Sequence, residues 1–327
     1  MIITVLNESE SLDRLLESLC DQTRRPDAVV VADGGSTDDT LQRLRTWGAS
    51  GRLPLEIRSE PGSNISRGRN VAIAACRQEL VACADAGVRL GATWLEHLLR
   101  PLQVEGGASV VACGFFLPEA LTVFETSLGA TVLPALEDIR PERFLPSSRS
   151  VAFSRSAWQA VGGYPEWLDY CEDLVFDLRL KARGYRFVFV PDAIVHFRPR
   201  PDLWSFAKQY FRYARGDGKA DLWRLRHLVR YGAYLVVLPA LLWLALRVSP
   251  GWLTLLGIGA AAMLYTPYKR LWPEMSALSP LQRLQAVCWV PAIRVTGDVA
   301  KMLGYPVGRL WRWRNRLSIP DWRRQET

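Results

Sequence analysis

Histidine and cysteine are scarce in this sequence, and the cysteines follow no recognised ligand pattern. Three of the 327 residues are His, and the six Cys, at positions 20, 76, 83, 113, 171 and 288, form no CxxC pair. Neither a structural zinc site nor a disulfide scaffold is therefore expected. No signal peptide opens the sequence, so we expect reduced, mostly buried thiols in a cytosolic domain.

Two common nucleotide-binding motifs are also missing. No GxGxxG follows the first predicted strand, and no GxxxxGK[ST] occurs. Their absence argues against a dinucleotide-dependent dehydrogenase and against a P-loop enzyme. Internal repeats and low-complexity segments are not visible either. The length then fits one large domain or two ordinary ones.

Charge is distributed unevenly along the chain. Residues 198–327 contain 21 Lys and Arg against 7 Asp and Glu, whereas residues 1–197 contain 20 against 26. The basic part also holds the long apolar runs. An anionic membrane surface is the partner that this combination favours.

Apolar runs of strand length alternate with segments of helical spacing in the first 110 residues. Runs this apolar are typical of strands that are covered on both faces of a parallel sheet. Ligands bind at the carboxyl ends of such strands, where Asp33 and Asp85 are found. Strands are predicted at residues 1–6, 28–32, 55–58, 80–84, 110–116 and 187–191, and helices around 12–19 and 41–44 and at 66–76 and 174–183.

Two apolar stretches, residues 228–246 and 251–267, have lengths at the short end of the range that can span a membrane. A short turn separates them, so they are predicted to form a membrane hairpin, and a pair of buried helices in a soluble domain is the alternative. Residues 286–308 are interrupted by charges and are predicted to form an amphipathic helix at the membrane interface. Arg-rich segments at 198–230 and 309–324 should both be cytoplasmic, which two spans satisfy.

Acidic side chains at three places suggest transfer chemistry. A carboxylate at a strand end, such as Asp85, can hold a divalent cation against a diphosphate. A separate acidic pair, Glu172-Asp173, can take a proton from an attacking hydroxyl. A structural interpretation also exists, because Asp33 can cap the following helix and Glu172-Asp173 can lie at a helix N-terminus.

Five short motifs follow one another along the sequence. They are Thr4-Val5-Leu6-Asn7-Glu8, Val31-Ala32-Asp33-Gly34-Gly35-Ser36-Thr37-Asp38, Arg69-Asn70, Asp85-Ala86-Gly87 and Glu172-Asp173. Their order and spacing resemble family 2 glycosyltransferases, over about residues 1–220. That family has the GT-A fold, a Rossmann-like, mixed and mainly parallel α/β sheet flanked by helices, and it uses nucleotide sugars. Here a C-terminal helical membrane region would follow.

The resemblance implies roles for individual residues. Asp173 would be the catalytic base with Glu172 beside it, and Asp33 would read the donor's nucleobase. Trp167 and Tyr170 would line the acceptor side, although both could equally be core residues. The Gln209–Tyr213 segment resembles a Gln-X-X-Arg-Trp motif, and a basic amphipathic helix on anionic lipid is the alternative interpretation. Donor binding would involve Thr4, Asn7, Glu8, Asp33, Arg69, Asp85, Arg212 and Arg215.

A divalent cation, Mg²⁺ or Mn²⁺, is the cofactor that the resemblance implies. Asp85 would hold it, and His196, after the last predicted strand, is a second candidate ligand. Gly87 stands where the family's Asp-X-Asp motif has its last carboxylate. Coordination by Asp85 directly, coordination through water, and a metal-free reaction therefore all stay open.

The resemblance implies a metal-assisted, inverting hexosyl transfer from a nucleotide-diphosphate sugar to a hydroxyl of a lipid or lipid-linked glycan. The site would face the cytoplasm at the inner or plasma membrane, in glycolipid or polysaccharide biosynthesis. Alternatives are a polyprenyl-phosphate acceptor and a non-catalytic nucleotide-sugar-binding subunit. No nucleic-acid partner is expected, since Arg and Trp at 308–314 suit an interfacial anchor. The predicted divisions are a catalytic domain at 1–197, basic interface helices at 198–227, a transmembrane hairpin at 228–270, and an amphipathic helix with a basic tail at 271–327.

Overall fold

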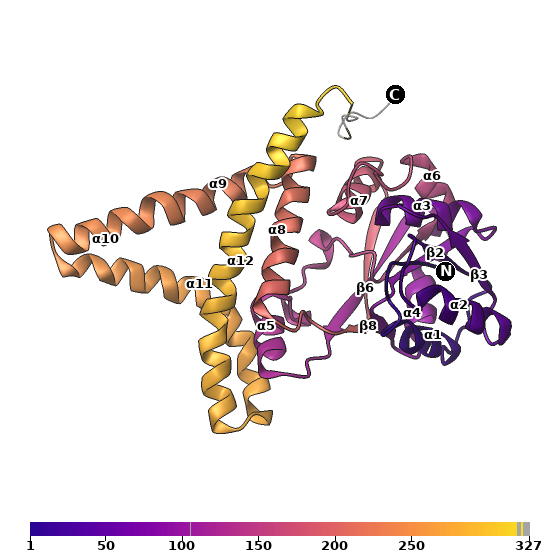
Figure 1. Cartoon of the computed structure of the whole chain (residues 1–327), viewed down its shortest axis with the longest axis horizontal. Coiled ribbons are helices and arrows are strands. Elements are labelled where there is room, and N and C mark those ends of the chain that lie inside the picture. The colour runs from indigo at the N-terminus through magenta and orange to yellow at the C-terminus, as the bar shows by residue number, and fades with distance from the viewer. Residues whose placement is uncertain (105, 319–321, 323–327) are drawn as a thin grey trace. The chain divides into compact units, whose positions relative to one another are not determined.

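The computed structural model describes residues 1–104, 106–318 and 322, and the chain divides into two compact units (Figure 1). The first unit is built mainly from Met1–Glu119 and Asp138–Arg198. The second is built from Ala120–Glu137 and Pro199–Ile319. A short internal segment of the chain therefore belongs to the second unit, although the sequence on both sides of it belongs to the first.

A mixed sheet of eight described strands forms the centre of the first unit. The strands are β1 (Ile2–Val5), β2 (Val29–Asp33), β3 (Leu55–Ser59), β4 (Leu80–Asp85), β5 (Val88–Leu90), β6 (Val110–Pro118), β7 (Val151–Ser154) and β8 (Arg186–Phe197). Their order is β3-β2-β1-β4-β7-β6-β8-β5. The first four in this order run parallel, and so do β6 and β8. β7 pairs antiparallel with β4 and β6, and β5 pairs antiparallel with β8.

Residues along the central strands point alternately into two hydrophobic cores. In β2, Val29 and Val31 belong to one core, whereas Val30 and Ala32 belong to the other. Because successive strand side chains point to opposite faces, each core lies on its own face of the sheet. This burial on both faces explains the continuous apolar runs in the sequence.

Helices cover both faces of this sheet (Figure 1). The first core includes residues of α1, α2 and α4, and the second includes residues of α3, α6 and α7. These helices are α1 (Leu12–Cys20), α2 (Thr40–Ala49), α3 (Ile65–Ala75), α4 (Trp94–Leu99), α6 (Arg155–Ala160) and α7 (Glu172–Ala182). Short 3-10 turns are η1 (Arg100–Leu102), η2 (Gly107–Ser109), η3 (Leu136–Asp138), η4 (Pro141–Arg143), η6 (Pro250–Trp252) and η7 (Met275–Ala277).

The six strands predicted from the sequence are all present, and the mixed, mainly parallel sheet is confirmed. β8 differs most from its prediction, because it continues to Phe197. Two strands were not predicted. β5 has three residues and β7 has four, so neither is long enough to show a period of two in the sequence.

The second unit is helical. Its helices are α5 (Val123–Val132), α8 (Leu203–Ala220), α9 (Arg224–Gly232), the π-helical η5 (Ala233–Val237), α10 (Leu238–Arg247), α11 (Leu253–Glu274) and α12 (Pro280–Arg314). α8 and α12 pack along each other at close range. A Cβ atom on Gly304 of α12 would lie 2.1 Å from the carbonyl oxygen of Phe211 on α8. Only a residue without a side chain allows the two backbones to approach this closely.

The π-helical segment η5 joins α9 to α10 just before Pro239. Proline lacks an N–H, and its ring clashes with the carbonyl of the preceding turn, so a widened turn lets the helix continue through Pro239. The resulting helix, Arg224–Arg247, is the one described helix that is long and apolar enough to cross a membrane. That finding concerns length and composition, with a mean hydropathy of 1.7 over the most apolar window.

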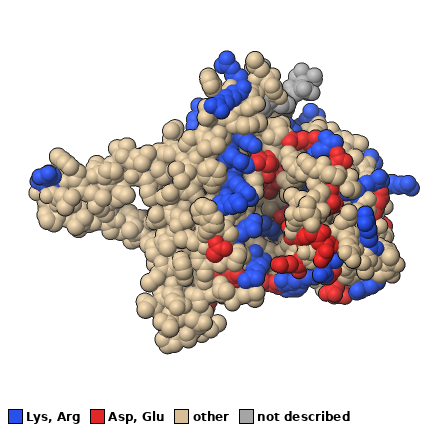
Figure 2. Space-filling view, viewed as in Figure 1, with Lys and Arg blue, Asp and Glu red and all other residues tan. Residues whose placement is uncertain are grey.

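The predicted hairpin is present as a pair of helices, α10 and α11, which lie side by side (Figure 1). Residues 251–267 fall within the 3-10 turn η6 and α11, a helix that does not meet the length and composition criterion for a span. Figure 2 shows that the paired helices carry almost no charged side chains. Arg247 is the single charged residue in the sequence from 231 to 268. Insertion of both helices into a membrane stays a prediction.

α12 contains the predicted amphipathic stretch, and it buries charge toward its neighbour. The buried carboxylate of Asp298 accepts hydrogen bonds from Arg230 Nε at 2.7 Å and from the Tyr234 hydroxyl at 3.1 Å. Val295, Val299 and Leu303 are exposed at four-residue intervals. One face of α12 is therefore an exposed apolar stripe. Asp298 of the same helix forms its ion pair and hydrogen bond with residues of the second unit.

Candidate active site

The carboxyl ends of three parallel strands meet at one edge of the sheet. Thr4 of β1 lies opposite Ala32 of β2 on one side and opposite Asp85 of β4 on the other. Asp33, the last residue of β2, lies opposite Val5. Asp33 and Asp85 thus occupy the ends of the strands that flank β1, where the sequence predicted a ligand site.

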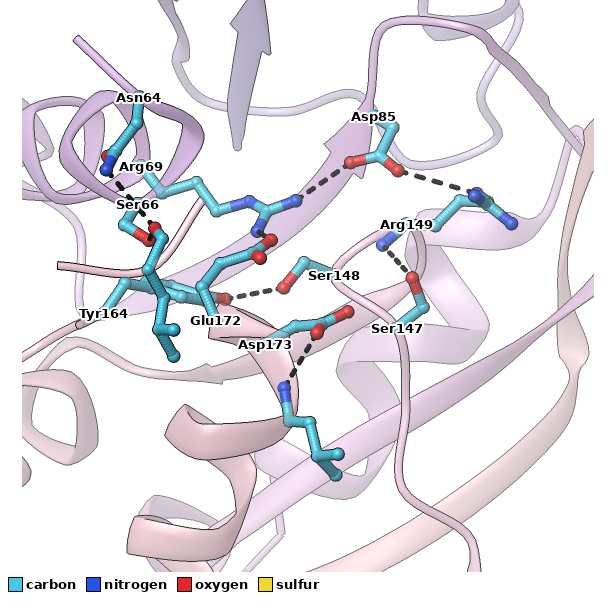
Figure 3. Close-up of polar contacts among 12 residues, drawn as sticks. Asn64, Ser66, Arg69, Asp85, Ser147, Ser148, Arg149, Tyr164, Glu172 and Asp173 are labelled. Carbon is cyan, nitrogen blue, oxygen red and sulfur yellow. Dashed lines mark hydrogen bonds and ion pairs between the residues drawn. The ribbon is translucent and has the colours of Figure 1, made fainter. Parts of the chain in front are cut away.

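Arg69 connects this edge to the start of α7. α3 begins at the N-cap Asn64, whose side chain accepts a hydrogen bond from the Arg67 amide at 2.9 Å. The buried Arg69 guanidinium donates from Nη1 to Glu172 Oε1 at 2.6 Å and from Nη2 to Asp85 Oδ1 at 3.0 Å (Figure 3). The arginine therefore joins two of the predicted site carboxylates, which are far apart in the sequence.

Glu172 and Asp173 form the first turn of α7. The helix N-terminus favours negative charge, and the Leu174 amide donates to Asp173 Oδ1 at 2.8 Å. Burial nevertheless raises the pKa of Glu172 to about 7, with Asp173 adding to the rise and Arg69 opposing it. Burial also raises the pKa of Asp173. Asp173 is half-buried, and its raised pKa suits it to accept a proton near neutral pH.

Asp177, one turn further along α7, is a third acidic side chain in this region. It is buried, and its Oδ2 atom has no hydrogen-bond partner among the described residues. Burial and the nearby Asp173 raise the pKa of Asp177 well above its usual value. Asp177 was not predicted, because an isolated Asp within a helix carries no motif.

Arg149 is a cation of the site that the sequence did not reveal. Its Nε lies 3.5 Å from Asp85 Oδ2, so Asp85 lies between the guanidinium groups of Arg69 and Arg149 (Figure 3). The Arg149 guanidinium is stacked over Phe197, with 4.2 Å between its Cζ and the ring centroid. Arg149 lies in the loop before β7, a strand that was itself too short to predict.

Asp33, Asn7 and Glu8 belong to a loop network beside this cluster. The Asp33 carboxylate accepts hydrogen bonds from the Gly35 and Ser36 amides at 3.2 Å and from the Ser36 hydroxyl at 2.6 Å. Asn7 Oδ1 accepts from the Thr37 amide at 2.8 Å. Glu8 accepts from the Ser11 hydroxyl at 2.7 Å. Asp33 does not cap the next helix, because α2 begins at Thr40 with Asp39 as its N-cap residue. The Asp33 carboxylate instead holds the loop that follows β2, and the network fixes the ends of β1 and β2.

His196 lies in a different polar cluster from Asp85. It is on β8 opposite Arg89 of β5, and its Nδ1 is 3.7 Å from Glu119 Oε1. Burial and the nearby Arg89 and Arg14 lower the pKa of His196. Among the described residues, no group of three or more His, Cys, Asp or Glu side chains is placed to hold a metal ion. His196 is thus not grouped with Asp85, and its role as a ligand stays a prediction.

The remaining predicted residues are distributed over both units. Trp167 and Tyr170 are half-buried in the segment that precedes α7, within the first unit. Arg212 and Arg215 lie on α8, in the second unit. The structure thus brings Arg69, Asp85, Glu172 and Asp173 together. The assignment of Trp167 and Tyr170 to the acceptor stays a prediction. The assignment of Arg212 and Arg215 to the diphosphate also stays a prediction.

Comparisons with known proteins concern the family and the fold of the chain. The model for glycosyl transferase family 2 matches residues 1–132, and the model for glycosyl transferase family group 2 matches residues 139–273. A solved structure of the mannosyltransferase PcManGT from Pyrobaculum calidifontis, in complex with GDP-Man and Mn²⁺, has a TM-score of 0.63 at 19% identity. The match covers 92% of this chain and 86% of that one. This likeness shows a GT-A-like fold.

Two curated relatives are similar over much of the chain. Succinoglycan biosynthesis protein ExoA from Rhizobium meliloti (strain 1021) is 27% identical over 300 residues, covering 88% of this chain and 89% of the relative. O-antigen chain rhamnosyltransferase WbaN from Salmonella anatum is 25% identical over 201 residues, covering 57% and 62%. Together with the fold, these matches support the assignment of this chain as a family 2 glycosyltransferase.

Proposed function

We propose that the protein is an inverting glycosyltransferase that moves one sugar from a nucleotide-diphosphate sugar to a hydroxyl of a lipid or lipid-linked glycan. The observation that carries the proposal is the position of Asp173. Its half-buried carboxylate has a raised pKa and adjoins Glu172, which Arg69 ties to Asp85 at the carboxyl edge of the sheet. A proton acceptor and a strand-end carboxylate are therefore held in one place by one buried cation.

The proposed reaction is a single displacement. Asp173 takes the proton of the acceptor hydroxyl, and the hydroxyl oxygen bonds to the anomeric carbon of the donor sugar. The bond from that carbon to the diphosphate oxygen breaks, and the nucleoside diphosphate leaves with the bonding electrons. Because attack and departure occur on opposite faces, the configuration at the anomeric carbon is inverted. Thr4, Asn7, Glu8 and Asp33 are the proposed contacts to the nucleoside, and Arg69, Arg212 and Arg215 the proposed contacts to the diphosphate.

A divalent cation fits this site to a limited extent. Mg²⁺ and Mn²⁺ take one or two protein carboxylates together with phosphate oxygens, and Asp85 offers one carboxylate whose side chain is 30% exposed. Gly87 offers none, and His196 contacts Glu119 instead. We propose that Asp85 holds Mg²⁺ or Mn²⁺ jointly with the donor phosphates. When bound, the ion would neutralise charge on the departing diphosphate.

The membrane is the proposed location of the acceptor. Leu242 and Trp243 of α10 and Val295 and Leu303 of α12 are exposed, and the paired helices α10 and α11 carry almost no charge. A lipid or lipid-linked glycan at the cytoplasmic face would lie where such helices insert, and the relatives named for succinoglycan and O-antigen chains support a glycan product.

Membrane binding is tested with Leu242→Arg and the matched control Leu242→Met. A charge at the centre of a membrane helix costs about 2.5 to 3.5 kcal/mol. We expect the arginine variant to move from the membrane pellet to the supernatant in cell fractionation, while Leu242→Met stays in the pellet. An unchanged distribution of Leu242→Arg would remove the second unit's membrane role.

The base assignment is tested by Asp173→Asn in the full chain purified in detergent. We expect transfer to a hydroxyl acceptor to fall by about 10²- to 10⁴-fold, because the amide cannot accept the proton. Nucleotide binding, followed by thermal shift, should persist. Undiminished transfer to a hydroxyl would refute the assignment. Transfer to a polyprenyl phosphate that survives the substitution would identify an already ionised acceptor instead.

A further inference from the structure

Arg149 takes no part in the proposed reaction. Its side chain is 20% exposed and extends toward Asp85, with 3.5 Å between Nε and Oδ2. Phe197 lies under the guanidinium plane at 4.2 Å, and the ring of Phe116 is 5.7 Å from Cζ. All four residues belong to the first unit. The two rings hold the guanidinium in one orientation at the strand end where the donor is proposed to bind.

Arg149 differs from Arg69 in how its donors are used. Arg69 is buried, and its two terminal nitrogens each meet a carboxylate. Within the described residues, the Arg149 guanidinium forms an ion pair with Asp85 through Nε, and its terminal nitrogens make no hydrogen bond. A planar guanidinium with two unused terminal nitrogens is suited to bidentate binding of a phosphate.

The ion pairs around Asp85 also leave Arg149 able to bind an anion. Arg69 is shared between Asp85 and Glu172, whereas the ion pair of Arg149 within the described residues is with Asp85 alone. Gly87 leaves out the second carboxylate, and a Cβ added there would meet nothing within 4 Å. The space next to Asp85 is thus open and lies beside cations, and it holds one anion fewer than an Asp-X-Asp sequence would place there.

We propose that Arg149 binds a phosphate of the donor's diphosphate beside Asp85. The inference rests on the proposed function and names a residue for its leaving group. Two N–H donors from the terminal nitrogens meet the phosphate oxygens, and the fixed positive charge stabilises the negative charge that gathers on them as the sugar departs. Part of the affinity for the diphosphate is therefore independent of any divalent ion.

A purely structural role for Arg149 makes a different prediction. In that case the arginine would anchor the loop before β7 by stacking on Phe197, and its loss would lower stability without changing selectivity for phosphates. The measurement must therefore separate the diphosphate's contribution from that of the nucleoside. Comparison of each nucleoside with its diphosphate on the same variant provides this separation.

The experiment uses the full chain in detergent with EDTA present. Uridine, guanosine, thymidine and their diphosphates are titrated by calorimetry against the wild type, Arg149→Met and Arg149→Lys. The control is Arg143→Met, which removes an exposed arginine from the same segment. We expect Arg149→Met to weaken diphosphate binding by about 10- to 100-fold while binding of the matching nucleoside is unchanged. Arg149→Lys should retain part of the affinity, because lysine keeps the charge but not the planar pair of donors.

The outcomes separate this inference from the proposed function. Equal diphosphate affinity in the wild type and Arg149→Met, with both folded by thermal shift, would overturn the role of Arg149 and leave the glycosyltransferase proposal standing. If no nucleoside diphosphate bound to the wild type with or without Mn²⁺, the proposed function would fail first. Equal weakening by Arg143→Met would also overturn the inference, since a general loss of positive charge would then explain the effect.

Discussion

Each unit of the protein contains an arginine that ties distant segments together, Arg69 in the first and Arg230 in the second, and the two differ in charge balance. In the first unit Arg69 meets two carboxylates, Glu172 and Asp85, with Asp173 next in the chain. In the second unit Arg230 meets one carboxylate, Asp298, whose other oxygen accepts a hydrogen bond from the Tyr234 hydroxyl. The cluster around Arg69 has more carboxylates than arginines. In the cluster around Arg230, each oxygen of Asp298 accepts a hydrogen bond.

This difference suits the proposed active site in the first unit and a packing contact in the second. Burial raises the pKa of Glu172 to about 7 and also raises the pKa of Asp173, so ionised carboxylates are held there at a cost in folding free energy. Such an arrangement persists where ionisation serves a reaction. Asp298 has a complete set of partners, and its effect is to fix α12 against α9 and η5.

The largest expected effect comes from replacing Arg69, and a separate replacement of Arg230 provides the comparison. Arg69→Met leaves the buried Glu172 without its cation and leaves Asp85 with Arg149 alone, and breaking a buried ion pair costs about 3 to 5 kcal/mol. Arg230→Met should cost less, because Asp298 keeps Tyr234 and has Arg294 at 3.7 Å. The folded fraction of Arg69→Met should have lost transfer activity, whereas that of Arg230→Met should keep its kcat.

Thermal unfolding in detergent and the transfer rate per folded molecule check this pair. The surface arginine of the Arg58–Glu56 pair offers a control, since Arg58→Met removes an exposed ion pair worth at most about 1 kcal/mol. If Arg230→Met abolished turnover while Arg69→Met did not, the distinction between site and packing contact would be reversed.

Sequence motifs located the site residues whose positions follow from local structure. Asp85 ends an apolar strand and Glu172-Asp173 begin a helix, so their placement could be predicted from runs and motifs alone. Arg149 could not, because it precedes a four-residue strand and reaches Asp85 through tertiary structure. His196 was expected near the metal, yet β8 continues past its predicted end and places His196 opposite Arg89, beside Glu119.

The second unit shows the same division between local pattern and tertiary contact. The length of two apolar runs predicted helices near 228–246 and 251–267, and helices are present there. The partners of Asp298 could not be predicted, because Arg230 and Tyr234 are more than sixty residues away in the sequence. The charges that interrupt 286–308 were expected to form a polar face, and Asp298 among them is buried in an ion pair instead.

The smallest expected effect tests the excess of acids directly, through the pH dependence of transfer. Asp173 must be deprotonated to act, so kcat/KM rises with pH until it loses its proton. Burial raises the pKa of Asp173, and a negative charge on the adjacent Glu172 opposes the ionisation of Asp173 as well. Glu172→Gln removes that charge, so the rise should move to lower pH and the rate at about pH 6 should increase relative to the plateau by about tenfold or less.

Glu166→Gln, an exposed neighbour that pairs with Arg67, should leave the profile unchanged. A move to higher pH in Glu172→Gln would mean that Asp173 is not the group that titrates.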